Sequence, residues 1–593
     1  MMRVRHLLRI GAASVCFILF AAGYACAEPE YFDAHNHFTG ILPYYAYANL
    51  PAFIAGVGNG SQSVSLGDRL ALYRYLAGTW YPAQGAALGN RLFSPAQGQR
   101  FAFGARAALE VYAPRVAGSA NDLDGVLERV LTATPWTEFD SAYAFRGGPA
   151  YEYLLSRFYG GNAPHLDADL CRATILDLAQ TDVHVSEQSL PFVGGWGFKD
   201  GRSAPLATIE CALHANRDAT VQAGLRAMDR PQPVVRFVLM THTAQLATQP
   251  GGATYSEWSQ TGACRDVALP LGLRTSPQTI ENALLARDDA GRDLLPPARR
   301  AEFFAGVVGI DTAGPETTCF TPGGMAYYRE LVTAVYDAAK RRRALGWHGK
   351  LLVHTHVGEG SVIDYAPDAP PPPWTFANAF STFPSSRSNS AQAGINISIL
   401  LAAIAQLERE RPDLRDYVVF RMAHDTWANE AQAAAMHDQG VEADVNLESN
   451  VATGAYPLAR APAGEAALIH DDVAPLIADE DANFALNDLL GVLVRDPDDP
   501  LQTGYVLGNS SLRYLLEKHV RCLLGTDAAG VEHSGIVNEY RYAAALIAYW
   551  SQTDSDFRAM APGVSQRTLF DDVRRHLADM ASDRRLPDEG GGG

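Results

Sequence analysis

Eight short apolar segments, most of them separated by helical stretches, constrain the fold of this chain more than any other feature. Each is rich in Val, Ile, Leu or Phe and ends in turn residues, which is typical of a buried β-strand. The segments lie at 31–40, 183–188, 234–241, 306–314, 351–357, 417–425, 441–450 and 520–530. Helical patterns at 325–343, 395–411, 428–438 and 537–550 lie between or after them. This order predicts an α/β fold, a (β/α)8 TIM-like barrel with long inserted segments.

A doubly wound open sheet is the alternative fold. Such sheets commonly bind dinucleotides at a Gly-x-Gly-x-x-Gly turn that follows the first strand. The sequence after the first expected strand lacks this spacing, and the G-V-G-N-G run from Gly56 to Gly60 lacks it as well. No phosphate-binding loop of the Walker type occurs either. The sequence therefore gives no support to chemistry with a nucleotide cofactor.

Residues 1–27 have the pattern of a secretory signal peptide. Arg3 and Arg5 precede an apolar run from Ile10 to Tyr24, and Ala25-Cys26-Ala27 fits a small-residue cleavage site. The apolar run is short for a membrane-spanning helix, which is the alternative reading. We therefore expect a secreted protein, periplasmic if the host is Gram-negative. Residues 28–593 are expected to form a single barrel domain, with insertions at about 41–170, 360–395 and 454–511.

Composition limits the partners of the chain. The net charge of -18 argues against a nucleic-acid surface, which needs a basic footprint. After the signal peptide, no segment reaches the ~20 unbroken apolar residues of a membrane span. The expected partner is a small-molecule substrate, and the sequence leaves the oligomeric state open.

Five cysteines follow the signal peptide, and no two of them form a Cys-x-x-Cys motif. A thiolate zinc site or a redox motif is therefore not expected. Cys522 lies in an apolar strand pattern, which favours an inert core thiol. An oxidising compartment permits disulfides, and we expect one or two among the remaining four, Cys171, Cys211, Cys264 and Cys319.

Polar residues gather at the ends of the expected strands, where the active sites of barrels lie. These residues are His35 and His37 in the first strand, His356 and Glu359 at the fifth, His424 at the sixth and Asp527 at the eighth. Side chains two apart on a strand face the same side, so His35 and His37 can share a metal ion. Three imidazoles and one carboxylate suit Zn²⁺ with a position left for water, and His35, His37, His356 and Asp527 form such a set.

The fifth strand, L-L-V-H-T-H-V-G-E-G from Leu351 to Gly360, carries a second histidine pair. His354 and His356 are expected to face the same side of the strand. A buried strand whose histidines only form hydrogen bonds in the core is the alternative interpretation. His354 could be such a core residue, or it could orient a metal ligand. His184, His242 and Glu187 could likewise line the pocket, or they could be core residues or, for Glu187, a surface charge.

Six motifs in this order resemble the adenosine deaminase family of the metal-dependent amidohydrolase superfamily. They are H-N-H-F-T-G, G-I-D-T-A-G-P-E, H-V-G-E, R-M-A-H-D, S-N-V-A-T-G and G-T-D-A, and they cover most of 31–540. The resemblance implies hydrolytic deamination of adenosine or a related amino-purine by a zinc-bound hydroxide. Zinc lowers the pKa of bound water from ~15.7 towards 7, which agrees with that chemistry.

The resemblance also implies a role for each matching residue. His35, His37, His356 and Asp527 would bind the metal, and Asp527 also belongs to the catalytic set. Glu359 would protonate the purine ring nitrogen beside the carbon under attack, and His424 would orient and help deprotonate the water. The backbone at Gly314 would contact the purine edge. Related enzymes with two metals use a lysine near the end of the fourth strand, which is absent here, so we expect one zinc ion per chain.

Two positions depart from the family pattern. Ala528 stands where an aspartate usually reads the purine, and Thr39 stands where an acidic residue often contacts the ribose in the substrate-binding site. These departures keep open an amidohydrolase that acts on a different C–N or ester substrate. A binding or signalling protein without turnover is a third hypothesis. The complete ligand set beside Glu359 and His424 argues against it. The other class of zinc deaminases is excluded because it requires a Cys-x-x-Cys motif.

Overall fold

Eight parallel strands form the barrel that the sequence predicts. The computed structural model describes residues 31–57 except 39 and 43, the single residues 65, 68 and 71, and 148–192, 205–258, 262–269, 275–314, 318–359, 390–423, 428–452, 511–529 and 535–581. The strand order is β1-β2-β3-β6-β7-β8-β9-β10. The strands are β1 (Tyr31–His37), β2 (Val183–Pro191), β3 (Val234–His242), β6 (Val307–Ala313), β7 (Leu351–His356), β8 (Val418–Ala423), β9 (Glu442–Val445) and β10 (Cys522–Leu524).

The barrel closes where the residues after β10 meet β1. His37 N donates to Asp527 O at 2.6 Å, and Asp527 N donates to His35 O at 2.9 Å. Asn36 and Asp527 form a parallel bridge at the same place. The first and the last strand of the chain are therefore neighbours in the sheet.

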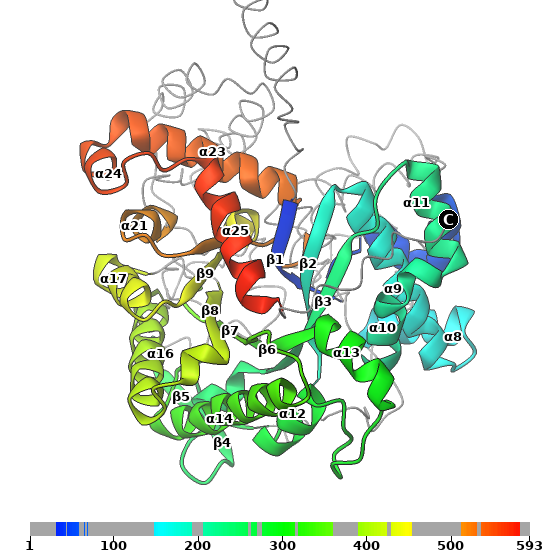
Figure 1. The fold of residues 1–593 in the computed structure, drawn as a ribbon, viewed down its shortest axis with the longest axis horizontal. Coiled ribbons are helices and arrows are strands. Elements are labelled where there is room, and N and C mark those ends of the chain that lie inside the picture. The colour runs from blue at the N-terminus through cyan, green and yellow to red at the C-terminus, as the bar shows by residue number, and fades with distance from the viewer. Residues whose placement is uncertain are drawn as a thin grey trace, which may run out of the picture.

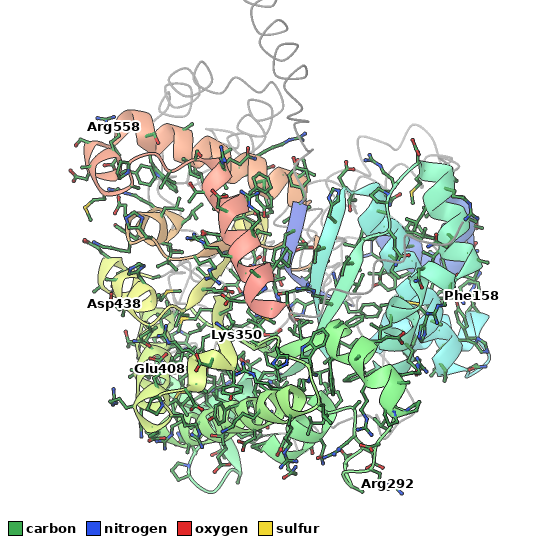
Figure 2. All side chains as sticks on the ribbon, viewed as in Figure 1. Phe158, Arg292, Lys350, Glu408, Asp438 and Arg558 are labelled. Carbon is green, nitrogen blue, oxygen red and sulfur yellow. A yellow bond between two sulfur atoms is a disulfide. The ribbon has the colours of Figure 1, made fainter. Side chains whose placement is uncertain are left out.

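Helices surround the strands on the outside (Figure 1). Thr321, Asn429 and Asp218 show why the chain forms helices there, because their side chains accept backbone N–H groups as N-caps. The helices are α2 (Leu50–Gly56), α8 (Gly148–Phe158), α9 (Ala163–Gln180), α10 (Pro205–Leu213), α11 (Ala219–Met228), α12 (Pro277–Leu284), α13 (Pro297–Gly306), α14 (Pro322–Ala344), α16 (Ser390–Glu410), α17 (Glu430–Asp438), α18 (Leu447–Ala452), α21 (Ser511–Glu517), α23 (Ile536–Thr553), α24 (Ser555–Met560) and α25 (Gln566–Met580). Figure 2 shows charged side chains such as Arg292, Glu408 and Asp438 at the periphery of the molecule.

The last helix, α25, covers the amino ends of the strands. Asp572 Oδ2 accepts a hydrogen bond from Cys522 N, at the start of β10. Asp579 O accepts one from Lys350 N, just before β7. Met580 packs into an apolar layer with one residue from each of four strands, Val238, Val308, Leu352 and Val419. The carboxyl ends of the strands, on the opposite side, remain for the functional site.

A two-stranded antiparallel hairpin follows β3 and was not predicted. It consists of β4 (Thr254–Trp258) and β5 (Cys264–Ala268). A disulfide joins Cys264 of this hairpin to Cys319, in the segment after β6. A second disulfide joins Cys171 of α9 to Cys211 of α10. The expectation of one or two disulfides among these four cysteines is therefore confirmed, and Cys522 is buried in β10.

The predicted segments agree with the observed ones, except that the seventh predicted strand, 441–450, is a strand only over β9 and its residues 447–450 belong to helix α18. All eight expected strands are present, and helices 325–343, 395–411, 428–438 and 537–550 correspond to α14, α16, α17 and α23. The helix α9 begins at Ala163, within the first expected insertion, and α16 begins at Ser390, within the second. Residues 454–510 of the third insertion and the signal peptide lie outside the described residues. In the described part of the chain, no helix combines the length and the apolar character needed to cross a membrane.

Candidate metal centre

Two histidines of β1 and an aspartate that follows β10 form one potential metal-binding group. His35 Nε2 lies 3.4 Å from Asp527 Oδ1, and His37 Nε2 lies 3.2 Å from the same oxygen. Zinc bonds of about 2.0–2.2 Å place neighbouring ligand atoms of a tetrahedral site about 3.3 Å apart. The donor set and its spacing therefore fit a zinc ion, and the barrel closure at Asn36 and Asp527 holds these side chains together.

His356 joins the two histidines of β1 from the end of β7. Its ring centroid lies 4.7 Å from that of His35 and 5.4 Å from that of His37. His354 also contacts His35, with ring centroids 4.7 Å apart. The two β7 histidines thus face the same side, as their spacing predicts. The structure brings together His35, His37, His356 and Asp527, the four residues predicted to bind the metal.

Burial prepares His35 for metal binding. Its side chain is fully buried, and this burial lowers the pKa of His35 to about 3 even though the contact with Asp527 acts in the opposite direction. The nearby imidazoles of His354, His356 and His37 lower the pKa further. His35 is therefore neutral at physiological pH, which is the state in which imidazole binds a metal.

Gly525 allows β10 to approach the centre closely. A Cβ at this position would lie 2.4 Å from Asn446 Oδ1, 2.9 Å from Asp444 Oδ1 and 2.9 Å from His35 Cβ. Any larger residue would displace groups around His35. The glycine before Thr526 and Asp527 thus has a steric role at this position.

Asp527 is oriented by a hydrogen bond as well as by its backbone. Ser449, in α18, donates from Oγ to Asp527 Oδ2 at 2.7 Å. Asp527 itself adopts φ of 57°, in the left-handed region. With Oδ2 accepting from Ser449, Oδ1 is the oxygen that faces the two β1 histidines. A partner that holds a ligand carboxylate in this way is a common feature of metal sites.

Glu359 lies directly beyond the end of β7. The chain turns at Gly358, which has φ of 97°, and the Glu359 side chain is buried with 8% of the residue exposed. A carboxyl group in such surroundings is shielded from solvent close to His356. This position suits a proton donor to a molecule that enters at the carboxyl ends of the strands.

Gly314 lies beside His242 at the same end of the barrel. It adopts φ of 150°, and a Cβ there would lie 2.8 Å from Thr243 Oγ1 and 2.9 Å from His242 Cε1. Ala244 N donates to His242 Nδ1 at 3.1 Å, so Nε2 of the neutral ring carries the proton. His242 is the last residue of β3, which places it with Gly314 at the site.

Two further candidates, His184 and Glu187, lie away from this group. Thr39 and His424 lie outside the described residues. His184 is near the start of β2, at the opposite end of the barrel from the site. Glu187 is neither a pocket residue nor a surface charge, because it is buried and pairs with Arg421 at 2.9 Å. The family resemblance gave no role to Glu187. In the structure its carboxylate forms an ion pair with Arg421 inside the barrel.

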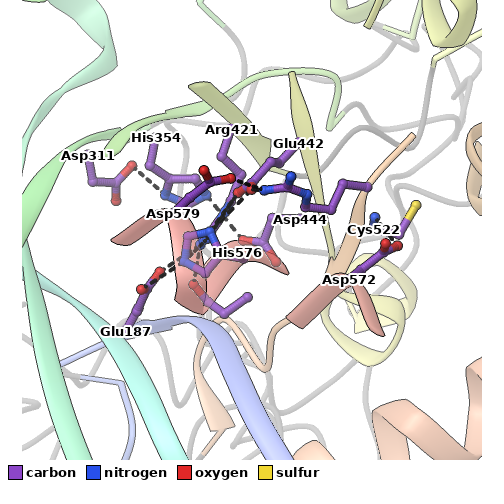
Figure 3. A network of polar contacts seen from close by, with 12 residues as sticks. Glu187, Asp311, His354, Arg421, Glu442, Asp444, Cys522, Asp572, His576 and Asp579 are labelled. Atoms are coloured by element: carbon purple, nitrogen blue, oxygen red, sulfur yellow. Dashed lines mark hydrogen bonds and ion pairs between the residues drawn. The ribbon is translucent and has the colours of Figure 1, made fainter. Parts of the chain in front are cut away.

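A polar layer lies in the barrel between the apolar layer at Met580 and the histidines. Arg421 donates to Glu187 Oε2 and to Ala34 O, each at 2.9 Å. His576 of α25 contacts Glu187 Oε1 at 3.1 Å and Glu442 Oε2 at 2.9 Å (Figure 3). The charges of Arg421 and His576 keep the pKa of Glu187 low despite its burial. This layer fixes β1, through Ala34, next to the first candidate ligand.

Asp311, Asp444 and Ser449 complete the centre and were not predicted from the sequence. Asp311 Oδ2 lies 3.5 Å from His356 Nε2, and Asp311 Oδ1 lies 3.0 Å from His354 Nδ1. Burial alone would raise the pKa of Asp311, but the imidazoles of His356 and His354 lower it well below its usual value. Asp311 lies in the I-D-T-A-G motif of the sequence. A polar residue at an inward-facing position of this apolar strand was the signal that could have identified it as a residue of the centre.

Comparisons with known proteins find similarity only among solved structures. The sequence matches no protein-family model and no curated protein. A crystal structure of an Arabidopsis N6-mAMP deaminase matches with 12% identity and a TM-score of 0.36, over 93% of this chain and 96% of that one. Adenine deaminase from Arthrobacter aurescens matches with 11% identity and a TM-score of 0.35, over 93% and 99%. A zinc-bound amidohydrolase from Burkholderia ambifaria matches with 12% identity and a TM-score of 0.30, over 93% and 92%.

Proposed function

We propose that this protein is a zinc-dependent aminohydrolase that deaminates adenosine or a related amino-purine, with one zinc ion per chain. The observation that carries the proposal is the convergence of His35, His37 and Asp527 at ligand-to-ligand distances of 3.2 and 3.4 Å, with His356 beside them. A bound zinc ion would supply an activated water molecule at neutral pH. The family motifs that contain these residues support the deamination chemistry.

The side chains of the protein would have separate roles in holding the metal ion, donating a proton and binding the substrate. Asp527 accepts the Ser449 hydrogen bond on one oxygen and offers the other to the metal side. Glu359, buried beyond β7, would donate a proton to the ring nitrogen of the substrate. His424 would orient the attacking water, and the backbone at Gly314 and the side chain of Thr39 would contact the substrate.

A substrate panel with a metal analysis tests this proposal. The purified protein is analysed for zinc and then assayed for ammonia release from adenosine, adenine and AMP. One equivalent of zinc and release from at least one purine are expected, whereas Glu359→Gln should keep the zinc and lose the release. Protein that takes up no zinc, or that binds zinc but acts on no amino-purine, would contradict the proposal.

One observation favours a second candidate, an amidohydrolase that acts on a different C–N or ester bond. Ala528 is fully buried, and a Cβ at Gly40 would lie 2.8 Å from Ala528 Cβ. Position 528 therefore has little space for a carboxylate side chain that could bind the substrate. Hydrolysis of amides or esters, together with no ammonia from any purine, would favour this candidate over the first.

We also propose that the protein is exported. The signal-peptide pattern of residues 1–27 motivates this proposal, and the disulfides Cys171–Cys211 and Cys264–Cys319 support it, since such bonds persist in oxidising compartments. Expression in a Gram-negative host should give a periplasmic protein whose N-terminus is Glu28. An intact N-terminus on protein recovered from the cytoplasm would contradict export without affecting the proposed reaction.

A further inference from the structure

Asp311 is a fully buried carboxylate that contacts the candidate metal centre from β6. Its Oδ2 atom lies 3.5 Å from His356 Nε2, close to the 3.4 Å that separates His35 Nε2 from Asp527 Oδ1. Ser189 of β2 donates to the same oxygen at 2.5 Å. The separation from His356 is that of two ligands of one ion rather than that of a short hydrogen bond.

His354 holds the other oxygen of Asp311. Its Nδ1 atom lies 3.0 Å from Asp311 Oδ1, and its Nε2 atom lies 3.1 Å from Asp444 Oδ2 (Figure 3). All three side chains are at most 1% exposed. The imidazole therefore links a carboxylate of β6 to a carboxylate of β9 inside the barrel, one layer below His356.

We propose that Asp311 contributes a carboxylate oxygen to the metal site, and that His354, anchored by Asp444, is the residue that positions it. This inference rests on the proposed zinc-dependent function. Asp311 belongs to a compact group with His35, His354 and His356, and this group shares His35 with the group of His35, His37 and Asp527. Its carboxylate would therefore act at the side of the centre formed by His35 and His356.

A different arrangement would make His354 itself a ligand, because His35, Asp311, His354 and His356 also form a compact group. Both ring nitrogens of His354 already face a carboxylate oxygen within 3.1 Å. Binding an ion through either nitrogen would replace one of these contacts and leave a buried carboxylate to be satisfied in another way. The positions of Asp311 and Asp444 on either side of the ring thus favour the positioning role.

The first experiment replaces Asp311 by asparagine and measures the metal directly. Zinc affinity is obtained by competition with a chelator, and the coordination of the ion by the visible absorption of the Co²⁺-loaded protein. Asp311→Asn should bind zinc about 10- to 100-fold more weakly than the wild type and change the intensity of the cobalt bands. Asp572→Asn, a buried aspartate in α25, is the matched control and should keep both properties.

The second experiment tests whether His354 acts through Asp311. His354→Gln alone should weaken zinc binding and shift the cobalt spectrum in the same direction as Asp311→Asn. In the Asp311→Asn background the same substitution should add little, because the group that it positions is already gone. Additive losses of affinity in the double variant would overturn the positioning role.

The outcomes separate this inference from the proposed function. Wild-type protein that binds neither zinc nor cobalt overturns both. Wild-type protein that binds one equivalent, with Asp311→Asn unchanged in affinity and spectrum, overturns only the role of Asp311. If Asp311→Asn does not fold, the variants His354→Gln and Asp444→Asn test the inference instead, because both should alter the cobalt spectrum. Spectra of both variants that equal the wild-type spectrum would overturn the inference.

Discussion

His576 of the last helix and Glu442 of β9 form an ion pair of 2.9 Å inside the barrel, where neither side chain is exposed by more than 2%. Glu187 contacts the other ring nitrogen of His576 at 3.1 Å, and Arg421 contacts both glutamates. The helix α25 therefore contributes a charged group to the interior as well as apolar residues.

Stability should depend on pH through His576. Burial alone would lower the pKa of His576, but the carboxylates of Glu442 and Glu187 outweigh that effect and raise it. A raised pKa in the folded state means that the stabilisation is complete below the unfolded value of about 6.5 and is lost as the pH rises through the folded value. Urea unfolding of the wild type between pH 6 and 10 should show this decline.

His576→Gln should remove that decline and destabilise the fold at pH 6 by about 3–5 kcal/mol, since it leaves two buried glutamates with one cation fewer. His437→Gln, at an exposed position of α17, is the control and should keep the wild-type profile. Equal pH profiles for His576→Gln and the wild type would show that the ion pair does not set this dependence.

Ser449→Ala should weaken zinc binding. The hydroxyl donates to Asp527 Oδ2 at 2.7 Å, and loss of such a partner typically costs 10- to 100-fold in metal affinity. Chelator competition measures the change, and Ser511→Ala, at a buried serine that begins α21, serves as the control. Unchanged affinity in Ser449→Ala would mean that the backbone alone orients Asp527.

Glu359→Gln should lower kcat by about 10²- to 10⁴-fold, the usual contribution of a positioned acid, with little change in zinc content. The substitution keeps the size of the side chain while removing its ability to donate a proton as an acid. Steady-state kinetics on the best substrate of the panel give the ratio. A kcat within about threefold of the wild type would exclude Glu359 as the proton donor.

Removal of the Cys264–Cys319 disulfide should destabilise the protein. The two cysteines are 55 residues apart, and the loop-closure model gives about 4 kcal/mol for such a loop. The double variant Cys264→Ser and Cys319→Ser should therefore unfold at a lower urea concentration than the wild type. A reductant also opens the Cys171–Cys211 disulfide, so reduced wild-type protein should unfold at a urea concentration no higher than that of the double variant. A midpoint of the double variant equal to that of the wild type would contradict the prediction.

The strands and the main residues of the site could be predicted because local patterns encode them. Runs such as Val234–Thr241 are apolar on both faces, as buried parallel strands require, and the His-x-His spacing places His35 and His37 on one side. The rule that barrel sites lie at the carboxyl ends of strands then brought His356 and Asp527 into the same set.

The remaining features depend on contacts between distant segments. Asp311 and Asp444 are isolated aspartates in apolar strands, and only the strand order shows that both face His354. His576 lies in a helix whose sequence gives no indication that it enters the barrel. The hairpin of β4 and β5 was missed because β4 has only five residues, and its aromatic residues Tyr255 and Trp258 are three apart and do not follow the period of two of a strand.

The contact between His37 and Asp527 would also set the order of events during synthesis if zinc binds as proposed. A candidate ligand of the first strand and one that follows the last strand face each other, so a nascent chain that ends before Asp527 has only the histidines of the candidate centre. Binding of the proposed ion at full affinity would thus have to wait until nearly the whole chain has been made and the barrel has closed. A bound ion would then report that folding is complete, and truncated chains would remain without it.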